Sequence, residues 1–439
     1  MASTVADRQR PPRQSPRPGW IDDWDPEDPE FWETTGRRVA RRNLVFSILA
    51  EHLGFSVWVL WSIVAVHLND AGFAFTESQL FWLVAVPNLV GATLRLPYTF
   101  AVPRFGGRNW TIVSALLLVL PCLGLAWAVS DPSTSFGTML LVASLAGVGG
   151  GNFASSMTNI SWFFPEREKG WALGLNAAGG NIGVAVVQAP FVVSAVVTAG
   201  AGLHLARAGL MWVPLALLAA FCAWRYMDNL SVARTDVASS AAAARRPHTW
   251  VMSLLYIGTF GSFIGYAAAF PLLIKGQFPD VDMTAYAFVG ALVGSLVRPL
   301  GGRLSDRIGG ARVTAVSFVA MGLGVLGVVG ALRLGSFAAF FGCFLVLFVA
   351  SGVGNGSTYR MIPAIFRHSK QEAAAAIGII SAVGAYGGFL VPRTYGWSTE
   401  AYGSIVPALF AYVGLYAVLL VVTWACYLRP RAVMARAAV

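Results

Sequence analysis

The chain has 439 residues, of which 56% are hydrophobic and 12% are charged. Soluble domains have about 45–50% apolar and about 25% charged residues, so this composition excludes an ordinary soluble enzyme. A mean hydropathy of +0.64 is typical of a chain built mostly from membrane-spanning helices of roughly 20–25 residues each. The net charge of +10 would suggest nucleic acid binding in a soluble protein. In a membrane protein it must be assigned loop by loop, and we expect no nucleic acid partner.

The first 42 residues are rich in Arg, Pro, Asp and Glu and contain no apolar run. They therefore predict a cytoplasmic tail, not a cleavable signal peptide. The stretch WIDDWDPEDPEFW (residues 20–32) is acidic and aromatic and could be a docking segment. We favour a tail that lies on the protein surface and assign it no role.

Apolar windows predict twelve membrane-spanning helices. They cover residues 43–68, 78–103, 110–130, 137–161, 171–197, 208–227, 249–274, 283–304, 312–332, 336–360, 373–393 and 404–428. Residues 228–248 have the Ala, Ser and Arg composition of a flexible cytoplasmic linker, and residues 429–439 form a second tail. The sequence thus predicts an all-α polytopic membrane protein with bundles at 43–227 and 249–428.

The placement of positive charge predicts the orientation. With the amino terminus in the cytoplasm, cytoplasmic segments hold 24 Lys and Arg residues, and the opposite side holds four: Arg207, Lys275, Arg333 and Arg393. This asymmetry satisfies the positive-inside rule and predicts that both termini are cytoplasmic. The four cysteines, Cys122, Cys222, Cys343 and Cys426, all lie in apolar stretches without metal-ligand spacing, so we expect core residues, no metal site and no cofactor.

The two halves of the chain repeat the same landmarks at an offset of 203 or 204 residues. The pairs are Arg95 with Arg298, Gly106-Gly107 with Gly309-Gly310, Gly151-Asn152 with Gly354-Asn355, and Gly174, Gly180 and Gly183 with Gly378, Gly384 and Gly387. A repeat of six helices in the same orientation predicts two parallel halves with a substrate site between them near the midplane. We therefore expect two bundles that rock about a central site.

Arg95 and Arg298 are the leading candidates for that site. Each lies roughly four to six residues from the middle of its span, or about 6–9 Å at 1.5 Å per residue, which is too deep to reach the interface easily. A charge near the bilayer centre costs about 2.5–3.5 kcal/mol, so each arginine needs a compensating partner. A buried carboxylate could serve, but we find no obvious acid deep in the bundle near either residue. Since a guanidinium fork suits a small planar oxyanion, we predict an anion site.

Glycine and asparagine are frequent in the fourth, fifth, tenth and eleventh spans. Each glycine costs a helix about 1 kcal/mol relative to alanine, but small residues allow close helix contact, and packing explains most of them. An amide in an apolar helix needs hydrogen-bond partners. For each of these asparagines, interhelical packing and substrate contact remain equal alternatives: Asn152, Asn176, Asn181 and Asn355.

Other polar residues in the spans have two interpretations. Tyr256 and Tyr359 could donate hydroxyl groups to an anion. Glu51 and His52, an adjacent ionisable pair in the first span, could bind a proton during transport, but we favour a salt bridge or a water-exposed crevice near the cytoplasmic end. Asp306 lies in the charged motif GGRLSDRIGG, and we predict that it forms a conformational latch between helices.

Several motifs closely resemble the NarK-type nitrate/nitrite porters of the major facilitator superfamily: GATLRLPYTF with PRFGGR, GGGNFASSMTNISWFFP, GWALGLNAAGGNIGVAVVQ, GTFGSFIGY, RPLGGRLSDRIGG and GVGNGSTYRMIP. The resemblance runs from about residue 42 to about residue 428. It implies the superfamily fold, with nitrate or nitrite held between Arg95 and Arg298 in a pocket without a titrating acid. Further substrate-site roles fall by resemblance on Asn181, Tyr256, Phe55, Phe153 and Phe260, and the glycines of the fifth and eleventh spans let these helices slide and bend. The chain departs from the usual pattern at Asn355 and Tyr359, where Ser and Phe are usual.

These features together predict an inner-membrane carrier that exchanges nitrate for nitrite by alternating access. We expect the protein to be surrounded by membrane lipid and to work as a monomer. An empty site leaves two arginines uncompensated in low dielectric, which opposes closure and favours obligatory exchange. The first alternative is proton-coupled nitrate symport through Glu51 or His52, and the second is a membrane sensor that binds nitrate. An enzyme is not expected, because the spans contain no nucleophile–base set.

Overall fold

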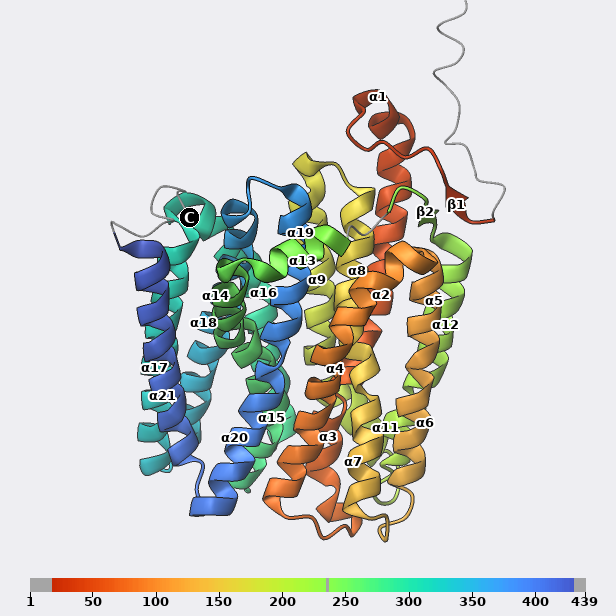
Figure 1. Cartoon of the computed structure of the whole chain (residues 1–439). Helices are drawn as coiled ribbons and strands as arrows, with labels where there is room; N and C mark the ends of the chain where they lie inside the picture. The colour runs from red at the N-terminus through yellow and green to blue at the C-terminus, as the bar shows by residue number, and fades with distance from the viewer. Residues whose placement is uncertain (1–17, 234–236, 430–439) are drawn as a thin grey trace, which may run out of the picture.

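Residues 18–233 and 237–429, which the computed structural model describes, fold almost entirely into long helices that run side by side (Figure 1). In this part of the chain, twelve helices are long and apolar enough to cross a membrane. The predicted number of spans and the all-α membrane fold are therefore confirmed. Several spans consist of two or three shorter helices in line, some of them joined by a π-helical segment.

The first bundle contains six spans and one short strand. Its elements are β1 (Trp20–Ile21), α1 (Pro29–Phe31), η2 (Trp32–Gly36), α2 (Arg37–Trp58), α3 (Trp61–His67), η3 (Asn69–Ala71), α4 (Glu77–Phe105), α5 (Gly107–Leu117), α6 (Val119–Ala128), α7 (Phe136–Leu145), α8 (Gly147–Phe163), α9 (Glu166–Gln188), η4 (Pro190–Ser194), α10 (Ala195–Thr198), α11 (Ala206–Leu210) and α12 (Trp212–Tyr226).

The connecting segment and the second bundle follow. Their elements are β2 (Asn229–Leu230), α13 (Val237–Arg245), α14 (Pro247–Tyr256), η5 (Ile257–Gly261), α15 (Ser262–Gln277), η6 (Met283–Ala285), α16 (Ala287–Ile308), α17 (Gly310–Arg333), α18 (Phe337–Ile365), α19 (Lys370–Ala385), α20 (Gly387–Tyr402), α21 (Val406–Thr423) and η7 (Trp424–Leu428).

The first helical run begins at Pro29, fourteen residues before the predicted start at residue 43. The Asp28 side chain accepts hydrogen bonds from the backbone N–H groups of Glu30 and Phe31, and proline occupies the first helical position. Both features are strong helix-start signals. The apolar window missed this start because the helix surface here is strongly basic, so hydropathy marks the membrane-embedded part of the helix and not its true end.

Residues 18–36, the described part of the predicted surface tail, pack against the first bundle and the connecting segment. Strand β1 pairs in parallel with β2 of the connecting segment. Trp24 and Trp32 are 6% and 0% exposed and belong to a separate apolar cluster with Phe163 and Phe164 at the end of α8. The indole N–H of Trp32 donates to Glu168, with Nε1 and Oε1 2.9 Å apart. The aromatic residues of this stretch are therefore structural.

The predicted flexible linker is also partly ordered. Helix α13 packs on α19, and its last residues bind the start of α14: the Thr249 hydroxyl donates to the Ala243 carbonyl (2.6 Å) and the Trp250 indole donates to the Ala244 carbonyl (2.8 Å). The alanine-rich composition that suggested flexibility also suits a helix, because alanine has the highest helix propensity. Residues 234–236 and the tails at 1–17 and 430–439 lie outside the described residues.

The internal repeat has a direct structural counterpart at the ends of α4 and α16. Each helix ends at a glycine in the left-handed region, Gly106 with φ +89° and Gly309 with φ +92°, and the next helix begins at the following residue. Such φ values favour glycine strongly. Arg95 and Arg298 each lie eleven residues before these glycines, so they occupy equivalent positions on equivalent helices.

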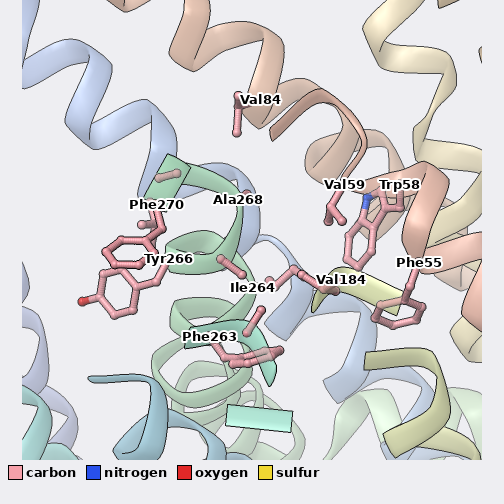
Figure 2. Close-up of a cluster of buried hydrophobic side chains, with 14 of the residues drawn as sticks. Phe55, Trp58, Val59, Val84, Val184, Phe263, Ile264, Tyr266, Ala268 and Phe270 are labelled. Atoms are coloured by element: carbon pink, nitrogen blue, oxygen red, sulfur yellow. The ribbon is translucent and has the colours of Figure 1, made fainter. Parts of the chain in front are cut away.

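The two bundles meet along α4, α9, α16, α19 and α20, and a single apolar cluster extends through both. Figure 2 shows Phe55 and Trp58 of α2 in the same cluster as Phe263 and Ile264 of α15. We call the side that carries α1, α13 and η7 the terminal side; it is the upper side in Figure 1.

The polar contacts that the structure describes between the bundles lie at the level of Arg95 or beyond it, away from the terminal side. Ser78 donates to Glu400 (2.7 Å) and Lys275 pairs with Asp70 (2.5 Å). The guanidinium of Arg393 lies 4.0 Å from the ring centroid of Trp82. These contacts therefore hold the two bundles together on the side opposite the termini.

Candidate functional site

Arg95 is fully buried on α4 and makes two hydrogen bonds to backbone carbonyls. Its Nε donates to Gly150 of α8 (3.2 Å), and its Nη1 donates to Ser381 of α19 in the other bundle (2.9 Å). Among the described residues, Nη2 of Arg95 has no hydrogen-bond partner, although it is shielded from solvent. A buried guanidinium with a free N–H group is a strong site for an anionic acceptor.

Arg298 occupies the equivalent position on α16 and is 7% exposed. Its Nη1 is buried and has no hydrogen-bond partner within residues 18–233 and 237–429. The two arginines are close enough to repel each other electrostatically. Two like charges in a low-dielectric interior repel each other, and an anion between them relieves this repulsion.

Aromatic rings from both bundles surround Arg95. Its guanidinium carbon lies 4.7 Å from the ring centroid of Phe153, 5.0 Å from that of Phe260 and 5.3 Å from that of Trp58. Phe153 and Phe260 stack at 6.3 Å, and Phe55 contacts Phe153 at 6.1 Å. Cation–π attraction holds the guanidinium in place while the rings exclude water. The structure thus brings together the three phenylalanines singled out from the sequence.

Two tyrosines lie on the Arg298 side of this cluster. The Tyr359 ring centroid lies 5.5 Å from the Arg298 guanidinium carbon and 6.1 Å from the Tyr256 ring, which stacks on Phe260 at 5.3 Å. Both hydroxyls interact electrostatically with the two arginines, but neither meets hydrogen-bond geometry with any described residue. Buried hydroxyls almost always have a partner, so these two are available donors.

The four asparagines divide into two groups. Asn176 donates to Glu51, with Nδ2 and Oε2 2.6 Å apart, so the structure gives it an interhelical partner. Asn181 and Asn152 are 0% and 3% exposed, and both amide atoms of each lack a partner in the described part of the chain. Asn355 is 1% exposed, and its Oδ1 also lacks a hydrogen-bond partner in the described part of the chain.

Glu51 differs most from its expected environment. It is 0% exposed, its Oε2 accepts hydrogen bonds from Ser156 and Asn176, and it interacts electrostatically with both Arg95 and Arg298. The favoured interpretation, a salt bridge or a water-exposed crevice, is therefore wrong, and so is the expectation of no acid near the arginines. The sequence did not reveal this because hydropathy does not show which face of a helix points inward. His52 is half-buried, with Nδ1 3.0 Å from the Gly179 carbonyl.

Four of the six repeated glycines in the fifth and eleventh spans lie at close helix contacts. A Cβ atom at Gly180 would overlap the Glu51 carboxyl group, and one at Gly183 would overlap the His52 carbonyl. In the second bundle, a Cβ at Gly384 would overlap the Tyr256 ring, and one at Gly387 would overlap Gly261.

The remaining members of the sequence-derived set make looser or more exposed contacts. A Cβ at Gly174 would meet nothing within 4 Å, and one at Gly378 would make ordinary contact with Thr99. Asp306 is half-exposed and pairs with Arg360 of α18, with Oδ1 and Nε 2.5 Å apart. This pair joins two helices of the same bundle.

Sequence reasoning missed three groups of the site. The Trp58 ring contacts Arg95, and its own N–H donates to the Pro87 carbonyl (2.8 Å). The carbonyls of Gly150 and Ser381 hold Arg95. Tryptophan is frequent in this chain and every residue has a carbonyl, so the sequence carried no signal for any of the three.

Comparison with known proteins agrees with this architecture. Residues 45–392 match the family "Major Facilitator Superfamily". The chain is 43% identical to "Nitrate/nitrite transporter NarU" of Escherichia coli (strain K12), over 93% of this chain and 96% of that one. It belongs to the NarK-type porters of the major facilitator superfamily.

Other relatives of these porters are consistent with this assignment. The chain is 39% identical to "Probable nitrate/nitrite antiporter NarK2" of Thermus thermophilus, over 94% of this chain and 97% of that one. Among solved structures, a D-xylose-proton symporter superposes with a TM-score of 0.66 at 16% identity, covering 87% of this chain and 96% of that one. At that identity the superposition shows the superfamily fold alone.

Proposed function

We propose that this porter is a secondary transporter that moves nitrate and nitrite across the inner membrane, with both termini in the cytoplasm. The observation that carries the proposal is the pair of repeat-equivalent arginines, one on each bundle, each with a buried N–H group that no described residue accepts. Nitrate and nitrite are small planar anions, which match the guanidinium fork. The names of the relatives support the same substrates.

We assign the anion to the space between Arg95 and Arg298. Tyr256 and Tyr359 would donate hydroxyl hydrogen bonds, and the amide groups of buried asparagines are further donors. The phenylalanine rings around Arg95 keep water out, which strengthens each of these interactions. The full proposed contact set is Arg95, Arg298, Tyr256, Tyr359, Asn181, Asn355, Phe55, Phe153 and Phe260.

Transport follows from the position of this site between two bundles. The described polar contacts between the bundles lie at or beyond Arg95, so an anion at the site is separated from the side opposite the termini. Release on that side requires α4 to part from α20. Rocking of the bundles exposes the site alternately on each side.

Exchange is the simplest mode of transport for this site. Arg95 and Arg298 repel each other, and that repulsion is largest when no anion lies between them. The loaded protein therefore changes conformation more readily than the empty one, so one anion leaves only as another returns. We expect a single chain to suffice, because all of these groups belong to one chain.

The test is nitrate uptake into proteoliposomes that contain nitrite or are empty, with and without an inward proton gradient. Exchange predicts uptake that requires internal nitrite and ignores the gradient. Uptake into empty vesicles that follows the gradient would establish proton-coupled symport, the second candidate, which the burial of Glu51 beside the arginines favours. No nitrate movement by folded protein under any of these conditions would overturn the proposed substrate.

A further inference from the structure

A groove of about 400 Å³ opens on the outer face of the second bundle, between α16 and α17. Helix α18 packs closely against both of these helices and forms the back of the groove. The lining is aliphatic apart from Ser317, whose hydroxyl donates to the Val313 carbonyl (2.9 Å). The lining residues Leu304 of α16, Val316 of α17 and Val346 of α18 are exposed, so the groove opens toward the surrounding lipid.

The groove follows the helices and offers an occupant no polar contact. Its lining on α17 extends from Val313 to Ala320, which spans about 10 Å along the helix axis at 1.5 Å per residue. Because the Ser317 hydroxyl is already bonded, the lining presents no free hydrogen-bonding side chain. A polar group placed here would lose its hydrogen bonds, so the occupant must be apolar over that length, as a lipid acyl chain is.

Two arginines lie at the terminal-side end of this groove. Arg307 is in the last turn of α16, next to Ile308, which lines the groove. Arg312 is in the first turn of α17, on the same face as Val316, which lines the groove one helical turn further on. Both arginines are exposed, and neither forms a hydrogen bond or an ion pair with any described residue. Asp306, the neighbouring acid, is already held in an ion pair with another arginine.

The first bundle has different side chains at the equivalent positions. At the offset of 203 residues, Ile308 and Val313 correspond to Phe105 and Trp110. Those two rings stack on each other with their centroids 5.8 Å apart. The guanidinium carbon of Arg104, the residue equivalent to the first of the two groove arginines, lies 5.8 Å from the centroid of the Phe105 ring. In the second bundle, smaller aliphatic side chains leave the groove open and the arginines at its end without a partner among the described residues.

We propose that this groove binds a phospholipid with an anionic headgroup. One acyl chain lies between α16 and α17, and the headgroup phosphate binds Arg307 and Arg312. An apolar groove that ends in two cations matches the order of groups along such a lipid, and guanidinium groups bind phosphate oxygens in pairs. Basic sites between membrane-spanning helices recognise anionic headgroups in the same way. A zwitterionic lipid carries its own cation beside the phosphate, so it gains less from the two arginines. The inference does not depend on which ion the protein transports.

The first experiment needs only the wild-type chain. The full-length protein is purified in detergent, stripped of lipid and titrated with phosphatidylglycerol or with phosphatidylcholine of the same acyl chains, and bound lipid is counted by native mass spectrometry. We expect one phosphatidylglycerol per chain, bound about tenfold more tightly than phosphatidylcholine. Equal affinity for the two lipids would overturn the inference. So would displacement of the lipid by an equal concentration of glycerol phosphate, which would mean that the arginines bind a phosphate without the groove. A dimer that lipid dissociates would identify a second copy of the chain as the occupant.

Variants at the arginines test the headgroup site. Arg307→Gln combined with Arg312→Gln should bind phosphatidylglycerol only as tightly as phosphatidylcholine, because the charge that distinguishes the two lipids is gone. Arg104→Gln, at the equivalent arginine of the first bundle, is the matched control and should keep the wild-type preference. An unchanged preference in the folded double variant would overturn the assignment of the headgroup to these arginines.

Variants of the lining test the acyl-chain site. Ile308→Phe combined with Val313→Trp introduces the ring pair of the first bundle and should weaken phosphatidylglycerol binding about tenfold by taking the place of the acyl chain. Val316→Trp, at an exposed lining residue, serves the same purpose if the double variant does not fold, with the melting temperature as the check on folding. Wild-type lipid binding in a folded variant of this kind would mean that the acyl chain does not occupy the groove, and would overturn the inference.

Discussion

Arg95 of the first bundle donates a hydrogen bond to the backbone carbonyl of Ser381 in the second, with Nη1 and O 2.9 Å apart. The proposed anion ligand is thus also a contact between the two moving bodies. When the bundles rock, this bond must lengthen or break, and the N–H group it releases becomes a further donor for the anion. Arg298 has no backbone bond described across the bundles, so the two arginines are equivalent in sequence but not in their connections.

Replacing either arginine by lysine tests whether nitrate binding requires the planar guanidinium group. Lysine keeps the charge but offers one ammonium point charge, so Arg95→Lys and Arg298→Lys should each weaken nitrate binding about tenfold or more. Calorimetric titration with nitrate measures the change. Arg303→Lys, an exposed residue on the same helix as Arg298, should bind as wild type does. Normal nitrate affinity in both site variants would show that binding does not depend on the guanidinium groups of Arg95 and Arg298.

Removing single tyrosine hydroxyls distinguishes a role in nitrate binding from a role in protein stability. Tyr256→Phe and Tyr359→Phe delete donors that no described residue accepts, so nitrate affinity should fall about tenfold, with thermal stability retained. Tyr412→Phe is the matched control, because the Tyr412 hydroxyl donates to the Val391 carbonyl at 2.9 Å. It should lose about 1 kcal/mol of stability and no nitrate affinity. The opposite pattern would identify Tyr256 and Tyr359 as structural.

Two glycines on α19 make contrasting contacts. A Cβ at Gly384 would lie 3.0 Å from Cβ and Cγ of Tyr256 and would overlap the edge of its ring, whereas one at Gly378 would lie 3.4 Å from the Thr99 methyl group. Gly384→Ala should therefore displace Tyr256 and reduce nitrate uptake about tenfold, because misplaced ligands bind poorly. Gly378→Ala should transport at close to the wild-type rate. Equal uptake by the two variants, measured in proteoliposomes at matched protein content, would show that α19 tolerates the added methyl group.

The amino-terminal segment is predicted to contribute to stability. Trp32 is 0% exposed and hydrogen-bonded to Glu168, so Trp32→Ala should cost about 3–5 kcal/mol and lower the melting temperature in detergent. Trp127→Ala, at a residue that is 65% exposed, should leave the melting temperature nearly unchanged. A stable Trp32→Ala variant would mean that β1, α1 and η2 add little to the folded state.

The repeat explains why so much of the fold could be predicted from sequence. The same offset of 203 residues separates Arg95 from Arg298 and the glycine pair after Arg95 from the one after Arg298. That offset alone places the two arginines, which are far apart in the chain, on equivalent helices. Left-handed φ angles at Gly106 and Gly309 give the pattern a geometric cause. Hydropathy located twelve spans because lipid requires about 20 apolar residues whatever their packing.

The unpredicted parts share a physical reason. Glu51 is buried because α8 and α9 cover its face of α2, and that covering depends on tertiary contacts that no local pattern contains. The carbonyls that hold Arg95 have no side-chain signature. Trp24 and Trp32 lie in a segment too charged to register as apolar, yet their rings meet a cluster formed by distant helices.

The charged side chains that the structure describes as fully buried or nearly so are Glu51, Arg95 and Arg298. A membrane potential does work of about 2.3 kcal/mol per charge per 100 mV on whatever charge crosses the field. In exchange, these groups cross the field with one monovalent anion bound in each direction, so the potential helps one half of the cycle as much as it hinders the other. Under the exchange proposal, anion uptake therefore continues when the membrane depolarises.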